Sequence, residues 1–128
     1  MVWYLDTSAF LKLLTQENET QAMRAWFHSH EMIWSSHLLA TEARRAGARL
    51  GLSTEVIDVA LESVALVLPS VATFYVAGQL LPTSLRSLDA LHLATAVEIG
   101  VDLDGVVTYD ERLADAARAA SLVVVTPR

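Results

Sequence analysis

The chain has 128 residues, of which 53% are apolar and none is cysteine, and its formal net charge is −6. This composition predicts one compact domain over residues 1–128, and it excludes disulfides and thiolate metal sites. Because Lys12 is the only lysine, a generally basic surface for nucleic acids is also excluded. Without a disulfide framework or a signal-peptide pattern, we expect a cytoplasmic protein.

Short apolar segments alternate with segments of helical periodicity along the chain. We expect strands at Val2–Leu5, Met32–Ser35, Ala65–Leu68, Gly105–Thr108 and Leu122–Thr126. We expect helices at Thr7–Leu14, Glu19–His28, His37–Leu50, Thr54–Ser63, Val71–Leu81, Leu85–Ile99 and Glu111–Ala119. The expected helix caps are Ser36, Ser53 and Ser84, and the expected stops are Gly51 and Gly100. This alternation predicts an α/β fold around a mainly parallel sheet.

The stretch from Ser63 to Leu85 has no charged residue and is long enough to cross a bilayer. A proline interrupts it, however, and several polar residues dilute it. A buried strand at Ala65–Leu68 followed by a core helix at Val71–Leu81 fits this stretch better. We therefore expect no membrane span.

Asp6 stands in LDTSAFLKL, between the first expected strand and the first expected helix. Its local interpretation is an N-cap, because an Asp side chain readily accepts a backbone N–H of the first helical turn. Its functional interpretation is a site at the edge of the sheet, because ligands bind beyond the carboxyl ends of parallel strands where the strand order reverses. Asp110, in TYDERL, follows the fourth expected strand and has the same two interpretations.

Glu42 lies in the third expected helix, three residues before Arg45, and a surface Glu–Arg pair is its local interpretation. Asp89 is harder to explain locally. With Ser84 as the cap, it falls in the second turn of a helix that is apolar nearly all round, where an ionised carboxylate needs a compensating partner. A pair with Arg86 is the structural alternative to a metal-binding or catalytic role.

The histidines carry weaker signals. His28 and His30 have a spacing that invites a zinc interpretation, but they stand near a helix end and we do not expect them to bind metal. His92 lies three residues after Asp89 on the same helix face. It either lines a site there or packs as a core or edge histidine.

Four acidic motifs follow one another along the chain: LDTSAFLKL, TEAR, LDALHLATA and TYDERL. Their order and spacing resemble the PIN-domain nucleases, specifically the toxin subunits of bacterial VapBC toxin–antitoxin modules. The resemblance implies a three-layer α/β/α sandwich with a parallel sheet of about five strands in the order 3-2-1-4-5. It also implies the acidic metal-binding and catalytic set, Asp6, Glu42, Asp89 and Asp110, with Ser8 and Thr108 as supporting hydroxyls.

The resemblance further implies metal-dependent hydrolysis of RNA, with tRNA or rRNA as substrate and Mg²⁺ or Mn²⁺ as cofactor. Carboxylates suit this role because hard divalent cations prefer oxygen ligands. Candidates for contacts with substrate phosphates are Arg44, Arg45, Arg49 and Arg86. Toxins of this kind generally form homodimers and are inhibited by a small VapB-type antitoxin. The apolar helices expected at Thr7–Leu14 and Thr54–Ser63 are candidate partner surfaces.

Two other interpretations remain to be compared. The first is a non-catalytic PIN-fold module that binds protein or RNA through a decayed site, although the presence of all four acids argues against decay. The second is a phosphoacceptor receiver domain, which would need adjacent acids after the first strand and a lysine after the last. Thr7 follows Asp6 and Lys12 is the only lysine, so the receiver interpretation is disfavoured.

Overall fold

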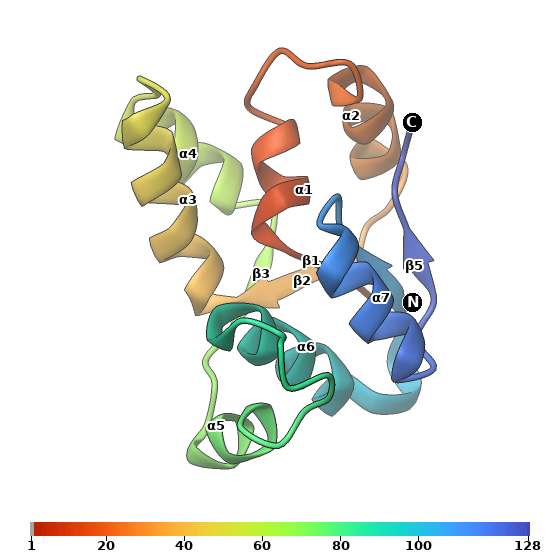
Figure 1. Cartoon of the computed structure of the whole chain (residues 1–128). Helices are drawn as coiled ribbons and strands as arrows, with labels where there is room; N and C mark the ends of the chain where they lie inside the picture. Colours follow the sequence, from red (N-terminus) through yellow and green to blue (C-terminus); the bar gives the residue numbers. More distant parts are fainter. Residues whose placement is uncertain (1) are drawn as a thin grey trace.

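The computed structural model describes residues 2–128, which form a five-stranded sheet with helices on both faces (Figure 1). The strands are β1 Val2–Leu5, β2 Ile33–Ser36, β3 Ala65–Val67, β4 Leu103–Val107 and β5 Val124–Val125. All neighbouring pairs are parallel, in the order β3-β2-β1-β4-β5. The expected order 3-2-1-4-5 is therefore confirmed. Successive strands are added on one side of β1 up to β3 and then on its other side as β4 and β5, so the strand order reverses between β1 and β4.

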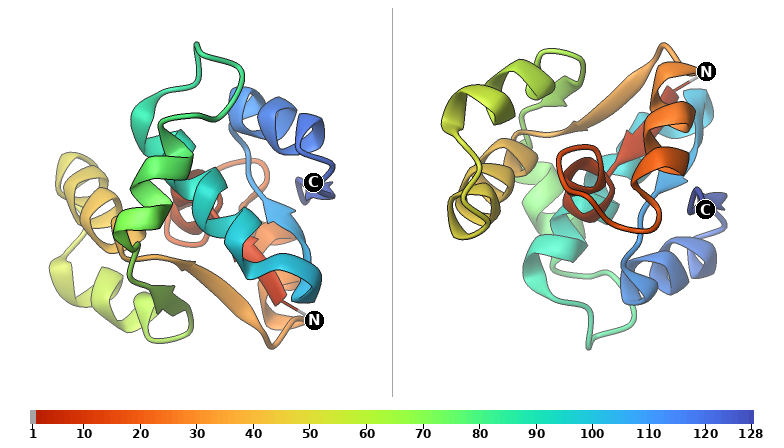
Figure 2. Two further views of the ribbon diagram at one scale, coloured as in Figure 1. Left: turned by 90° about the horizontal axis from the view of Figure 1, so that it is seen from below. Right: turned by 90° about the horizontal axis from the view of Figure 1, so that it is seen from above.

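Helices connect successive strands and cover the two faces of the sheet. They are α1 Thr7–Lys12, α2 Thr20–His28, α3 His37–Arg49, α4 Thr54–Leu61, α5 Val71–Ala77, α6 Ser87–Ile99 and α7 Glu111–Ala119, and a 3₁₀ turn, η1 Gly100–Asp102, precedes β4. Seen from above, α1 lies near the middle of one face, with α3 and α4 to one side and α2 to the other (Figure 2). Seen from below, α5 and α6 cross the opposite face, so the arrangement is the expected three-layer sandwich.

Alternating side chains of the central strands divide the core between the two faces. Leu5 and Val107 pack under α1 to α4, whereas Tyr4 and Val106 pack against α6 and α7. All four side chains are buried. Burial on both faces is what a parallel sheet with crossover helices requires, and it explains why these strands appear as continuous apolar runs in the sequence.

The segment between residues 63 and 81 differs from its prediction. Ala65–Leu68 is not a buried strand, because β3 lies at the edge of the sheet and both Ala65 and Leu68 are exposed. Val71–Leu81 is not a core helix: α5 ends at Ala77, packs on α6 and leaves most of its side chains exposed. Within residues 2–128, none of the helices has the length and apolar character that crossing a bilayer would require.

The start of α6 also differs from its prediction. The helix begins at Ser87 with Arg86 at the N-cap position, and no side chain caps it. The predicted cap, Ser84, lies in a turn closed by a hydrogen bond from Leu85 N to Pro82 O of 3.0 Å. As a result, Asp89 lies in the first turn of α6 and not in the second.

Gly105 in β4 is packed closely between β1 and the segment that leads into β5. A Cβ atom added there would lie 2.7 Å from the carbonyl oxygen of Val123 and 2.7 Å from Cζ3 of Trp3. The carbonyl belongs to the backbone that pairs with β4 and cannot rotate away. Only glycine therefore fits this position without moving a strand.

We expect Gly105→Ala to lower the free energy of unfolding by about 1–3 kcal/mol, as overpacking of a filled core does. Urea unfolding measures this change. The matched control is Gly78→Ala, because a Cβ there would meet no atom closer than 3.5 Å, and its effect should stay within about 0.5 kcal/mol. An unchanged urea midpoint for Gly105→Ala would contradict this account of the β4–β5 contact.

Candidate active site

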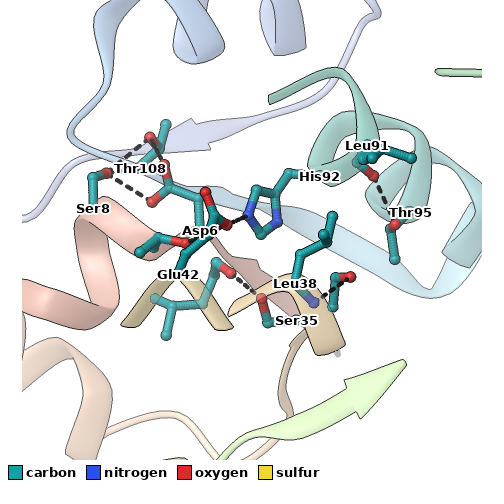
Figure 3. Close-up of polar contacts among 12 residues, drawn as sticks. Asp6, Ser8, Ser35, Leu38, Glu42, Leu91, His92, Thr95 and Thr108 are labelled. Carbon is teal, nitrogen blue, oxygen red and sulfur yellow. Dashed lines mark hydrogen bonds and ion pairs between the residues drawn. The ribbon is translucent and has the colours of Figure 1, made fainter. Parts of the chain in front are cut away.

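The carboxyl ends of β1 and β4 meet at one edge of the sheet, next to the reversal of strand order. Leu5 pairs with Val107, and the backbone N–H of Asp6 donates to Val107 O at 3.2 Å. Asp6 and Thr108 therefore emerge side by side from paired strands. Figure 3 shows these residues at the sheet edge, with Glu42 from α3 and His92 from α6 beside them.

Asp6 is the most buried of the four predicted site acids, with 4% of its surface exposed. Its Oδ1 accepts a hydrogen bond of 3.0 Å from Ala9 N, so the N-cap interpretation is confirmed. Thr108 Oγ1 donates to Oδ2 at 2.6 Å, and Ser8 Oγ lies 2.7 and 2.9 Å from the two oxygens. Burial raises the pKa of the Asp6 carboxyl above its ordinary value, and these hydrogen bonds oppose that rise.

Backbone N–H groups orient the two hydroxyls toward Asp6. Tyr109 N donates to Ser8 Oγ at 2.9 Å, and Asp110 N donates to Thr108 Oγ1 at 3.0 Å. Each hydroxyl oxygen thus accepts from the backbone and keeps its own proton for the carboxylate. The two residues predicted as supporting hydroxyls therefore both lie in contact with Asp6.

Glu42 binds His92 and Thr7 and makes no pair with Arg45. Its Oε1 accepts hydrogen bonds from Thr7 Oγ1 at 2.8 Å and from His92 Nε2 at 2.6 Å (Figure 3). Burial alone would raise the pKa of the Glu42 carboxyl, but the bonds from His92 and Thr7 outweigh it, so the pKa is lowered. Glu42 is therefore ionised at neutral pH.

Asp89 is half-buried in the first turn of α6. Burial is the main cause that raises its pKa, the charge of Asp110 is the next, and Glu42 adds to the rise. Across residues 2–128, no hydrogen bond or ion pair joins Arg86 to Asp89, so the structural alternative for Asp89 is not formed. Asp89 instead lies close enough to the two other acids to be repelled by their charges.

Asp110 is the N-cap of α7, where its Oδ1 accepts hydrogen bonds from Arg112 N at 2.9 Å and Leu113 N at 3.2 Å. Its local interpretation as a helix cap is therefore confirmed. It also lies at the same sheet edge as Asp6, and its functional role stays a prediction. A hollow of about 350 Å³ opens beside it. The hollow is lined by Arg86, Asp89, Asp110, Glu111 and Arg112.

The predicted arginines do not gather at one place. Arg44 is bound to Asp58 through Nη2 at 2.8 Å, away from the acids. Arg45 and Arg49 are exposed along α3, and only Arg86 lines the hollow beside Asp89. Sequence reasoning missed Arg112, which lines the same hollow, although its place two residues after Asp110 in TYDERL was a usable signal.

Sequence reasoning also left His92 undecided and did not consider Tyr4. The structure buries both and joins them by a hydrogen bond of 2.7 Å between Tyr4 Oη and His92 Nδ1. A usable signal was the tyrosine within an otherwise apolar strand, because a buried hydroxyl needs a partner. His30, by contrast, lies away from this site and stacks on Trp26 with ring centroids 4.1 Å apart.

The donor chemistry of the site fits a hard divalent cation. All four acids offer carboxylate oxygens. Burial is the main cause that raises the pKa of Asp89, and the repulsion from Asp110 and Glu42 that adds to it is of the kind that a bound cation relieves. The acids do not form a complete metal-coordination site, however. In the described part of the chain, no three Asp, Glu or His side chains are placed so that they could together bind one metal ion. Which of the four acids bind an ion therefore stays a prediction.

Known proteins resemble this chain over nearly its whole length. The family model described as PIN domain matches residues 3–119. Ribonuclease VapC46 of Mycobacterium tuberculosis is 40% identical over 125 residues, covering 97% of this chain and 96% of that protein. Ribonucleases VapC47 and VapC35 of the same species are 36% and 39% identical, with the same coverage.

Among solved structures, M. tuberculosis VapC20, described as a toxin that cleaves the sarcin–ricin loop, has the same fold. The two structures superpose with a TM-score of 0.78 over 98% of this chain and 99% of that chain. Their sequences are 16% identical, so this likeness supports the fold alone. The family match and the full-length relatives go further: the chain belongs to the PIN-domain family and, within it, to the VapC ribonucleases.

Proposed function

We propose that this protein is a Mg²⁺- or Mn²⁺-dependent endoribonuclease, the toxin of a type II toxin–antitoxin module, and that it inhibits translation by hydrolysing RNA phosphodiester bonds. The names of its full-length relatives support the ribonuclease activity. One observation carries the metal dependence: acids from four distant segments lie at one sheet edge, where burial and then the charges of Asp110 and Glu42 raise the pKa of Asp89.

Asp6 and Asp89 are the primary ligands in this proposal, and Glu42 and Asp110 bind a second ion or position the attacking water. A bound ion would lower the pKa of a coordinated water, polarise the phosphoryl group and offset charge on the departing oxygen. Ser8 and the other hydrogen-bond donors to Asp6 keep that carboxylate from rotating. Glu42 stays ionised and can accept a hydrogen bond from a water molecule.

The substrate in this proposal is tRNA or rRNA, bound near the hollow that Arg86 and Arg112 line. A cognate VapB-type antitoxin and a second copy of the chain are the proposed partners, in the cytoplasm. Of the two helices predicted as partner surfaces, α4 supports this role because Val56 and Val59 are exposed. None of the α1 residues is exposed, so that helix offers little surface to a partner.

Removing one acid tests the catalytic proposal. We expect Asp89→Asn to lower the rate of RNA cleavage at least about a hundred-fold, because an amide is a much weaker ligand for a hard cation. The measurement is cleavage of a panel of tRNAs and rRNA with Mg²⁺, Mn²⁺ or chelator. The control is Asp58→Asn, an exposed acid bound to Arg44, which should cleave at the wild-type rate.

The outcomes separate two candidate functions. Undiminished cleavage by Asp89→Asn would refute the assignment of this residue. Divalent-ion binding by the wild type without cleavage of any RNA would instead favour the non-catalytic interaction module.

Asp89→Asn should also stabilise the metal-free protein. Because the pKa of Asp89 is raised in the folded state, its charged form destabilises the fold at neutral pH. After solvent screening we expect a gain of about 0.5 kcal/mol, or about 2 °C in Tm, in chelator at pH 7. The gain should disappear below about pH 4, where the unfolded-state carboxyl is also protonated.

Thermal unfolding of the wild type and Asp89→Asn, in chelator and with Mg²⁺, measures this change. Addition of Mg²⁺ should raise the Tm of the wild type more than that of Asp89→Asn, because only an intact site binds the ion well. A clear drop in Tm for Asp89→Asn in chelator would show that Asp89 has a stabilising partner and does not suffer repulsion.

The arginines of the hollow should contribute to RNA affinity through phosphate contacts. We expect Arg112→Gln to weaken RNA binding and to lower the slope of log affinity against log salt by about 0.7, the value for one phosphate of a single strand. Fluorescence anisotropy at several salt concentrations measures the slope. Arg44→Gln is the control, because Arg44 is already bound to Asp58, and a loss as large as that of Arg112→Gln would argue for non-specific charge.

A further inference from the structure

His92 links the two helices that carry Glu42 and Asp89 to the strand that leads into Asp6. It lies on α6, three residues after Asp89, and only 2% of its surface is exposed. Its Nδ1 lies 2.7 Å from Tyr4 Oη on β1, and its Nε2 lies 2.6 Å from Glu42 Oε1 on α3 (Figure 3). One imidazole ring therefore connects β1, which leads into Asp6, with the helices that carry Glu42 and Asp89.

The positions of the protons in the hydrogen bonds between Tyr4, His92 and Glu42 follow from donor and acceptor chemistry. An ionised carboxylate only accepts, so the hydrogen bond to Glu42 requires a proton on His92 Nε2. In the neutral ring Nδ1 is then an acceptor, and the Tyr4 hydroxyl donates to it. Every buried side-chain nitrogen or oxygen in residues 2–128 has a partner, as this arrangement requires.

Two donors meet on the same oxygen of Glu42. Thr7 Oγ1 and His92 Nε2 both donate to Oε1, and among residues 2–128 no hydrogen bond reaches Oε2. A glutamate side chain has several rotatable bonds, and ordering them costs entropy that the two hydrogen bonds offset. The paired donors therefore fix the carboxylate and leave one of its oxygens available.

We propose that Tyr4 and His92 are positioning residues that hold Glu42 with Oε1 engaged and Oε2 presented to the divalent ion or its water. This inference rests on the proposed function, because it assigns a purpose to the orientation of Glu42. His92 is not itself a ligand, since both of its ring nitrogens are engaged by protein groups. Partners that orient a ligand in this way typically change metal affinity when they are removed.

The test is the affinity of the full chain for Mn²⁺, measured by calorimetry for the wild type, Tyr4→Phe and His92→Gln. Tyr4→Phe removes one oxygen and keeps the ring in the core. We expect both variants to bind Mn²⁺ about ten-fold more weakly and to cleave RNA with a lower kcat and an unchanged KM. The matched control is Thr20→Val, a buried residue on α2 that donates to Thr15 O, and its Mn²⁺ affinity should equal that of the wild type.

A double-mutant cycle separates positioning from general damage to the fold. In a Glu42→Gln background, the added substitution Tyr4→Phe should cause no further loss of Mn²⁺ affinity, because the group being positioned is already altered. The same ten-fold loss in that background would overturn the proposal. Wild-type Mn²⁺ affinity in Tyr4→Phe and His92→Gln would also overturn it and leave the ribonuclease proposal standing.

Two further outcomes keep the proposal testable if the variants do not fold. Nitrogen NMR of the metal-free wild type should show the His92 ring protonated at Nε2, and a ring without that proton would overturn the inference. A wild type that neither binds Mn²⁺ nor cleaves RNA would overturn the proposed function and this inference with it.

Discussion

The burial of the Asp6 carboxylate is the constraint on which this edge of the sheet depends. A charge in that position is costly unless hydrogen bonds replace its water, and the donors come from two segments that are far apart in sequence. Ala9 and Ser8 follow β1, whereas Thr108 follows β4, and the backbone after Thr108 in turn orients both hydroxyls. Satisfying one carboxylate therefore ties together the ends of two strands, and it places Asp110 beside Asp6 as a consequence.

The four acids differ in how the fold treats them. Asp6 and Glu42 each accept hydrogen bonds from two or more groups, so their charges are compensated within the protein. Asp89 lies at the rim with a raised pKa and no compensating pair from Arg86. The buried acids are held by hydrogen bonds, whereas the charge of Asp89 at the rim, where a cation would enter, is only partly offset by those of His92 and Arg86. Destabilising features of this kind are expected at functional sites, where other contacts offset their cost.

Apolar periodicity predicted the elements well where the core determines them. β1 and α7 have the predicted bounds, and the positions of Asp6 and Asp110 after paired strands followed from the rule for parallel sheets. The failures lie where local pattern and tertiary packing disagree. Ser84 is a good cap in isolation, but the turn at Pro82 delays the start of α6. The contacts between Tyr4, His92 and Glu42 join residues up to 88 positions apart, so no local pattern could reveal them.

Net charge and local charge have different consequences here. A chain with a net charge of −6 repels a polyanion at long range, but this repulsion is screened within about 8 Å at physiological salt. At contact distance the local arrangement dominates, and the hollow beside Asp89 and Asp110 carries Arg86 and Arg112 on its wall. The acids of the hollow would repel an RNA phosphate unless a cation lay between the acids and the phosphate. The arginines of the hollow would attract the phosphate. In the proposed function, a divalent ion would therefore be needed for productive RNA binding as well as for hydrolysis, and it would let the site hold a phosphate at the point of cleavage without a basic surface elsewhere.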